Sequence, residues 1–376
     1  MVNKLEELHA LGQSIWYDNI ERRLLKNGMF KQMINRGDIR GVTSNPSIFN
    51  KAIAKSDEYN DELIILARKG LEKEEIYQQL SIKDIQTSAD LFYPLYNETN
   101  YGDGYVSLEV NPYLAYDTEK TLKDAVYLWT HVNRPNLMVK IPATKEGLPA
   151  ITQAIMQGIN INVTLIFSLE RYKEVVEAYL MGIEKRLANG LRVDNIASVA
   201  SFFVSRIDTN VDNRLNTLME TGKSDSASVK KLQGKLAIAS AKLAYQEFKE
   251  IFGSKRFKVL ESKGANLQRP LWASTSTKNP AYPDTTYVDN LIGPNTVNTV
   301  PPKTLQAFKD HGKVELTLEN GVDEARQAFV DIEALGISMD EVTQELEDQG
   351  VKAFADAFTN LLNSIEERRK ETLKKS

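Results

Sequence analysis

The chain has 376 residues, and its 47 Lys and Arg against 51 Asp and Glu give a formal net charge of −4. This balance argues against a dedicated nucleic-acid-binding protein, because no basic excess is available to hold a phosphate backbone. The absence of cysteine excludes disulfides, thiolate nucleophiles and zinc–thiolate sites, and the three histidines are too far apart in sequence to suggest a metal cluster. We therefore expect acid–base chemistry to rest on Asp, Glu and Lys.

The N-terminal segment is charged throughout, and no segment reaches the ~18 uninterrupted apolar residues that a membrane-spanning helix needs. A hydrophobic content of 42% and a charged content of 26% are ordinary for a globular protein. We expect a cytoplasmic protein that contacts neither membrane nor nucleic acid.

Short runs rich in Val, Ile, Leu and aromatic residues alternate with longer segments of helical periodicity. The predicted strands are 14–18, 39–45, 105–110, 137–142, 161–167, 195–204, 270–275 and 295–301. Among the helices, Tyr172, Val176 and Tyr179 form an apolar stripe behind Ser168, a predicted N-cap. Eight strands that alternate with helices favour a closed (β/α)8 TIM barrel in the α/β class. A doubly wound sheet is disfavoured, because no G-x-G-x-x-G turn follows the first strand.

The length alone would suggest two or three domains at about 150 residues each, although barrels of ~250 residues often form one. The spacing of the strands points instead to long helical connections at about 46–104 and 206–268, and to a helical tail at about 303–376. We predict one barrel domain spanning 1–376, with two insertions and a C-terminal extension.

Polar residues interrupt the predicted strands near their carboxyl ends, where barrel enzymes carry their active sites. These residues are Asp18, Thr43, Asn45, Glu109, Lys140, Asn162, Thr164 and Ser201. They come from distant parts of the sequence, and a closed barrel would bring them together.

Lys140 lies in the apolar run LMVKIP and is predicted to point into the barrel. Burial disfavours the charged form of a lysine and leaves a neutral amine able to attack a carbonyl. Structural roles are alternatives for each residue: Lys140 could reach solvent or only pair with Glu109, Asp18 could cap a helix, and Asn45 before Pro46 could belong to a turn. The constellation as a whole favours a function.

Several segments, in the same order, resemble the transaldolases. They are GVTSNPSIFNKAI (41–53), MVKIPATKEGLPAI (138–151), GININVTLIFS (158–168), SVASFFVSRID (198–208) and LWASTSTKNPAYPDT (272–285), and 287–308 resembles the longer-chain members. The resemblance implies a barrel enzyme of the pentose phosphate pathway that needs no metal or other cofactor. It would move a dihydroxyacetone unit from sedoheptulose 7-phosphate or fructose 6-phosphate to glyceraldehyde 3-phosphate or erythrose 4-phosphate. Its partners would be these sugar phosphates, and the protein would be a monomer or a homodimer.

The resemblance also implies roles for the catalytic residues. Lys140 matches the lysine that forms the Schiff base, and Asp18 matches the acid–base aspartate. Glu109 is similar to the glutamate that acts through a water molecule, and Thr164 to the threonine that holds this water.

The substrate-binding residues follow in the same way. Asn45 and Asn162 match the asparagines that bind the donor's hydroxyls, with Thr43 beside the first. Ser201 and Arg206 match the pair that binds the hydroxymethyl end and the phosphate.

Lys278 stands where many members of the family have a second phosphate-binding arginine, and a lysine lacks the bidentate fork of that residue. Arg269 is a nearby alternative, but it precedes the predicted strand and would lie at the wrong end of the barrel.

Three other functions remain open from the sequence. An aldolase would release dihydroxyacetone to solvent, an inactive barrel would only bind sugar phosphates or a partner protein, and a pyridoxal-phosphate enzyme would also use a Schiff-base lysine.

Overall fold

Seven parallel strands form the centre of the computed structural model, which describes residues 3–54, 56–222, 224 and 226–374. The strands are β1 (Gln13–Tyr17), β2 (Val106–Glu109), β3 (Leu137–Pro142), β4 (Ile161–Ile166), β5 (Ser198–Phe203), β6 (Gln268–Ala273) and β7 (Thr296–Val300). Their order in the sheet is β1-β7-β6-β5-β4-β3-β2. Nearly every strand residue is buried, as in a parallel sheet that helices cover on its outer face.

The segment around Val42 closes this sheet into a barrel. Val42 forms parallel bridges to Tyr17 in β1 and Val106 in β2, the two strands at the ends of the sheet. Its amide donates to the Tyr105 carbonyl (2.9 Å), and its carbonyl accepts from the Ser107 amide (2.9 Å). The strand predicted at 39–45 is therefore reduced to the two bridges at Val42, which occupy the eighth strand position of the barrel. The (β/α)8 class is confirmed.

Strand pairing is limited to Val42 because the residues on both sides of it make other contacts. Gly41 lies flat against Trp16, and a Cβ on it would be 2.6 Å from the indole ring. After Thr43 the chain enters a helix, and the Asn45 side chain accepts a hydrogen bond from the Ile48 amide (3.0 Å). Asn45 thus caps a helix, where the sequence suggested turn chemistry as an alternative.

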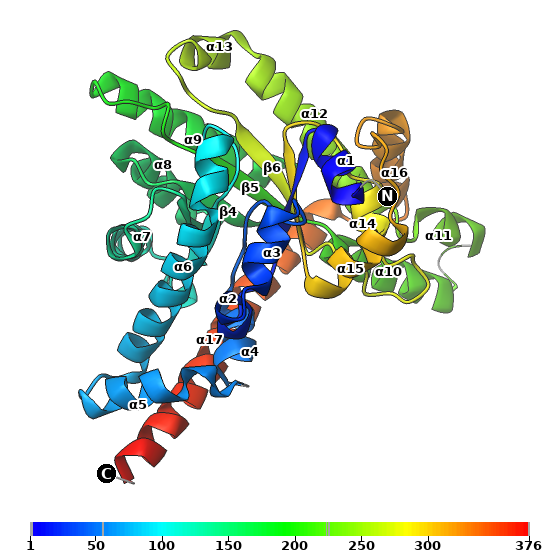
Figure 1. The fold of residues 1–376 in the computed structure, drawn as a ribbon. Helices are drawn as coiled ribbons and strands as arrows, with labels where there is room; N and C mark the ends of the chain where they lie inside the picture. Colours follow the sequence, from blue (N-terminus) through cyan, green and yellow to red (C-terminus); the bar gives the residue numbers. More distant parts are fainter. Residues whose placement is uncertain (1–2, 55, 223, 225, 375–376) are drawn as a thin grey trace.

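The helices cover the sheet and fill the long connections (Figure 1). They are α1 (Lys4–Ala10), α2 (Arg22–Lys26), α3 (Met29–Asn35), α4 (Pro46–Ala54), α5 (Asn60–Arg68), α6 (Lys73–Glu98), α7 (Thr118–Val132), α8 (Gly147–Gln157), α9 (Leu169–Ala188), α10 (Ser205–Glu220), α11 (Ser226–Leu232), α12 (Leu236–Gly253), α13 (Lys255–Glu261), α14 (Thr286–Asp289), α15 (Pro302–His311), α16 (Val322–Ala334) and α17 (Met339–Lys374), with short 3-10 turns η1 (Asp57–Tyr59) and η2 (Pro112–Leu114). The predicted N-cap Ser168 is confirmed, since its side chain accepts from the Arg171 amide at the start of α9.

The last helix, α17, is the longest and runs beside α4, α5 and α6 (Figure 1). Its apolar face includes Phe354, Phe358, Leu361 and Ile365, all buried. Because α17 also contacts β4 and α10, it reaches the carboxyl ends of the strands.

Arg269 lies inside β6, one residue after its start, so the expectation that it precedes the strand is wrong. Its guanidinium donates to Ser14 Oγ (2.7 Å) and to the Thr296 carbonyl (2.7 Å), at the amino ends of β1 and β7. Arg269 therefore closes the amino-terminal end of the barrel, opposite to the predicted site.

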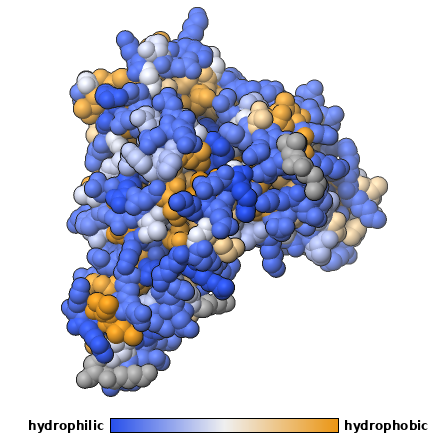
Figure 2. Space-filling view, in the orientation of Figure 1, coloured by the Kyte–Doolittle hydropathy of each residue, from blue (hydrophilic) through white to orange (hydrophobic). Residues whose placement is uncertain are grey.

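The face of the molecule shown in Figure 2 is mostly hydrophilic, with apolar areas that are small and separate. Among the helices of the described residues, none is both long enough and apolar enough to cross a membrane.

Candidate active site

A cavity of about 380 Å³ opens at the carboxyl ends of the strands. Eight of the ten predicted site residues line it: Asp18, Thr43, Asn45, Lys140, Thr164, Ser201, Arg206 and Lys278. They lie directly after β1, in the segment that follows Val42, on β3, β4 and β5, at the start of α10 and in the loop after β6. Glu109 and Asn162 do not line the cavity, but both contact residues that do.

Lys140 and Glu109 face each other on adjacent strands. Residues 140 and 109 are paired in the register of β3 and β2, and both side chains are about 5–6% exposed. Lys140 Nζ donates to the Ser44 carbonyl (3.0 Å) and lies 3.6 Å from Glu109 Oε2. Burial raises the pKa of Glu109 to about 7, although the charge of Lys140 acts in the opposite direction. Near neutral pH, Glu109 is therefore able to accept or donate a proton.

Thr164 lines the cavity beside an irregularity in β4. The pairing with β5 shifts between Val163 and Ile166, and Leu165 has a φ of +61°. Such bulges often re-aim a side chain beside an active site. The hydroxyl of Thr164 and Glu109 Oε2 are both buried and find no hydrogen-bond partner among the described residues. A buried polar atom without a hydrogen-bond partner lowers the stability of the fold by about 1–3 kcal/mol. These two atoms are therefore suited to bind a polar group from the substrate or solvent.

Asp18 follows β1 directly and is held by hydroxyl groups. Its Oδ1 accepts from Thr43 Oγ1 (2.7 Å), and Thr43 in turn lies 2.6 Å from Thr299 Oγ1. Burial raises the pKa of the Asp18 carboxyl, and the charge of Lys140 opposes this effect. The helix-capping alternative for Asp18 is wrong, because α2 begins after Glu21.

Asn162 lies below the cavity rather than in its wall. Its Nδ2 donates to Ser107 Oγ (3.0 Å), and its Oδ1 accepts from Ser201 Oγ (2.6 Å). The bond to Ser107 fixes the Asn162 amide, whose oxygen in turn orients Ser201, a residue that does line the cavity.

Three cations surround the outer part of the cavity: Arg206, Lys278 and Lys51. Arg206 is the second residue of α10, and its guanidinium lies 5.4 Å from the centre of the Phe203 ring. Lys278 Nζ donates to Ser276 Oγ (2.6 Å). Burial, followed by the positive charges of Arg206 and Lys51, lowers the pKa of Lys278. Like charges that are gathered in this way favour an anionic ligand.

Several residues that line the cavity have no role in the sequence prediction, and Lys51, Phe203 and Phe354 are the ones that matter here. Phe203 could have been predicted from the sequence. Residues i and i+2 of a strand share a face, and Ser201, two residues earlier, was predicted to face the site. Phe354 belongs to the helical tail predicted at about 303–376, but nothing in the sequence places that tail over the barrel. Lys51 stands on α4, whose orientation the sequence does not reveal.

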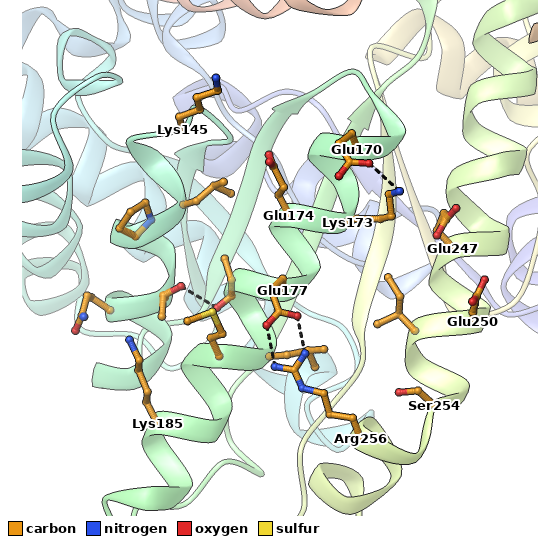
Figure 3. Close-up of a pocket in the computed structure, with 18 residues that line it drawn as sticks. Lys145, Glu170, Lys173, Glu174, Glu177, Lys185, Glu247, Glu250, Ser254 and Arg256 are labelled. Carbon is orange, nitrogen blue, oxygen red and sulfur yellow. Dashed lines mark hydrogen bonds and ion pairs between the residues drawn. The ribbon is translucent and has the colours of Figure 1, made fainter. Parts of the chain in front are cut away.

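A larger groove of about 920 Å³ lies on the outside of the barrel, along α8, α9 and α12 (Figure 3). Its charged side chains are partly neutralised by one another, as in the pairs Glu170–Lys173 (2.8 Å) and Glu177–Arg256 (2.5 Å). None of the predicted site residues lines this groove, so the cavity at the strand ends is the candidate active site.

Comparison with known proteins agrees with this geometry. The family model described as Transaldolase/Fructose-6-phosphate aldolase matches residues 15–365. The chain is 47% identical to a transaldolase of Trichodesmium erythraeum over 375 residues, which cover 99% of both chains. It is 47% identical to a transaldolase of Frankia alni and 45% identical to a transaldolase 2 of a Nostoc species, each over 97% of both chains. The chain therefore belongs to the transaldolase/fructose-6-phosphate aldolase family.

Proposed function

We propose that the protein is a transaldolase that moves a dihydroxyacetone unit between sugar phosphates through a Schiff base on Lys140. The observation that carries this proposal is the buried Lys140 amine, 3.6 Å from a carboxylate and at the wall of a cavity that also holds Asp18 and cations. The donor would be sedoheptulose 7-phosphate or fructose 6-phosphate, and the acceptor glyceraldehyde 3-phosphate or erythrose 4-phosphate.

The first step is attack of Lys140 Nζ on C2 of the ketose. Glu109 accepts the proton that the amine must lose, and its elevated pKa lowers the cost of this transfer. The same carboxyl then returns the proton, through a water held by Thr164, to the hydroxyl that leaves C2 as the imine forms. The protonated imine withdraws electrons from the neighbouring bond, so one difficult cleavage becomes two easier steps.

The second step is cleavage of the C3–C4 bond. Asp18 takes the proton of the C4 hydroxyl while the electrons of the bond move toward the imine, and the aldehyde leaves. When the acceptor aldehyde adds, Asp18 returns a proton to the new hydroxyl. Proton transfers of this kind typically contribute 10²–10⁴-fold each.

The remaining polar residues bind and orient the sugar. Asn45 and the Asn162–Ser201 pair provide hydrogen bonds for hydroxyl groups, and Arg206 and Lys278 bind the phosphate, with Lys51 as a third cation. The amino end of α10 adds favourable backbone dipoles beside Arg206. Such positioning supplies orientation that the bimolecular reaction lacks.

We further propose that one barrel domain, as a monomer or a homodimer, carries out this reaction in the cytoplasm. The supporting argument is that the proposed site draws its residues from positions 18 to 278 of a single chain, and that its substrates are intracellular sugar phosphates.

A coupled assay with sedoheptulose 7-phosphate and glyceraldehyde 3-phosphate tests the proposal, together with borohydride trapping and peptide mapping. We expect transfer and a covalent adduct on the peptide that contains Lys140. Absence of the adduct would refute the Schiff-base step. Release of free dihydroxyacetone from fructose 6-phosphate at the same rate with and without acceptor would identify an aldolase instead.

The pH dependence of the reaction should report the titration of Glu109. Since burial raises the pKa of Glu109 to about 7, the group is protonated below that pH and cannot take the proton from Lys140. We therefore expect kcat/KM for the donor to rise through pH 7 and to level above it. Glu109→Gln should lower the rate and remove this limb of the profile. If kcat/KM of the variant still rose through pH 7, a group other than Glu109 would be responsible for the pH dependence.

Replacing Arg206 should weaken the binding of phosphorylated sugars. A lost charged hydrogen bond of about 1.5–3 kcal/mol predicts a KM for fructose 6-phosphate that is roughly 10–100-fold higher in Arg206→Ala, with a smaller change in kcat. The matched control is Arg214→Ala on the same helix, where the side chain pairs with Glu345 outside the cavity (2.6 Å). An equal KM increase for unphosphorylated fructose would place the phosphate elsewhere.

A further inference from the structure

Phe354 of α17 covers the amine of Lys140. The ring lines the cavity and is 5% exposed, and its centre lies 5.9 Å from Lys140 Nζ. An aromatic face attracts a cation within about 6 Å. The nitrogen of a protonated Schiff base occupies the position of Nζ and also carries a positive charge, so the ring is placed to contact it.

The helix that carries Phe354 is fixed across the barrel opening. One turn earlier, a Cβ on Gly350 would be 2.9 Å from Leu165 of β4 and 3.6 Å from the guanidinium of Arg206, so α17 passes very close to the strand end. Before Phe354 in α17, Glu347 pairs with Arg171 of α9 (3.2 Å). After Phe354 in the same helix, the Arg368 guanidinium donates to the Ile53 carbonyl of α4 (2.7 Å). The ring is therefore a fixed wall of the site.

We propose that Phe354 is the wall that keeps solvent away from the three-carbon intermediate on Lys140 and thereby favours transfer over release. This inference rests on the proposed Schiff-base function and adds a residue that controls the fate of the intermediate.

The chemistry explains why such a wall is needed. After the first aldehyde leaves, the three-carbon unit is an enamine, and transfer requires its carbon to attack the acceptor. Loss begins when that carbon takes a proton instead. Water then adds to C2, the C–N bond breaks, and free dihydroxyacetone leaves as the lysine amine is regenerated. An apolar wall limits the access of solvent to the intermediate and leaves Glu109 and Thr164 as the polar side from which water acts.

The test measures the ratio of free dihydroxyacetone to transferred product with fructose 6-phosphate and a limiting acceptor. In Phe354→Ala this ratio should rise roughly five- to ten-fold, because water can then enter the space that the ring occupies beside the enamine. The borohydride-trappable adduct should also decay faster without acceptor. Phe354→Leu retains most of the apolar volume and should show a smaller increase.

Leu362→Ala is the matched control, because Leu362 is on the same helix, is 3% exposed and lies outside the cavity. It should lower thermal stability without changing the ratio. Folded Phe354 variants that keep the wild-type ratio and adduct lifetime would overturn the inference. Failure of the wild-type protein to form any adduct on Lys140 would instead refute the proposed function, so the two outcomes are distinguishable.

Discussion

Replacing Lys140 by methionine is expected to reduce transfer by roughly 10⁴-fold or more, because the covalent route is lost with its nucleophile. Methionine has a similar length and suits the surrounding apolar side chains of β3, whose residues are all buried. The substitution leaves Glu109 without the positive charge that lowers its pKa, so this carboxyl is expected to become protonated at neutral pH rather than remain a buried unpaired charge. Borohydride trapping with fructose 6-phosphate should give no adduct.

Lys145→Ala is the control for this prediction. Lys145 follows the same strand but is exposed and lies along the outer groove, so its removal should leave transfer and trapping unchanged. A circular dichroism melt of both variants separates loss of chemistry from loss of the fold. Substantial transfer by Lys140→Met, or an adduct that maps to another lysine, would contradict the proposed nucleophile.

Local sequence pattern was sufficient to predict most of the barrel wall. The strand predicted at 137–142 is β3 with the same bounds: the apolar run ends at Pro142, and the Thr144 side chain then accepts from the Gly147 amide (3.0 Å) at the start of α8. The strand at 39–45 is the informative exception. There the contact of Gly41 with Trp16 and the capping of α4 by Asn45 limit pairing to the residues around Val42. Such tertiary contacts cannot be inferred from the segment alone.

The inner part of the candidate site was more predictable than its outer part. Lys140 and Thr164 stand on strands, and strand alternation with barrel closure directs both toward one cavity. Asn162 shows the limit of this argument, since it faces inward but lies one layer deeper, behind Ser201.

Long-range packing determines the remainder of the site. Phe354 is more than 200 residues from Lys140 in sequence, and its role depends on where α17 crosses the barrel. Lys51 depends likewise on the orientation of α4, which packs against α17. Helical periodicity shows which face of α17 is apolar, but it does not show what that face covers.

Asp18→Asn should separate bond cleavage from Schiff-base formation. The asparagine oxygen can still accept the hydrogen bond from Thr43, so the geometry at the end of β1 is retained. It cannot accept the proton of the C4 hydroxyl, and turnover should fall roughly 10²–10⁴-fold. Since Lys140 and Glu109 are intact, the donor should still form its imine and then stop before the C3–C4 bond breaks.

The mass of the trapped adduct decides this prediction. With fructose 6-phosphate, the wild-type protein should yield mainly a three-carbon adduct after borohydride reduction, whereas Asp18→Asn should yield the intact six-carbon sugar phosphate. The control is Asp84→Asn, which alters a buried carboxylate that accepts hydrogen bonds from Arg22 (2.8 Å) and Tyr59 (2.7 Å) away from the cavity. That change should reduce stability but leave the three-carbon adduct unaltered. If Asp18→Asn formed the three-carbon adduct at the wild-type rate, the group that accepts the C4 proton would have to be another residue of the cavity.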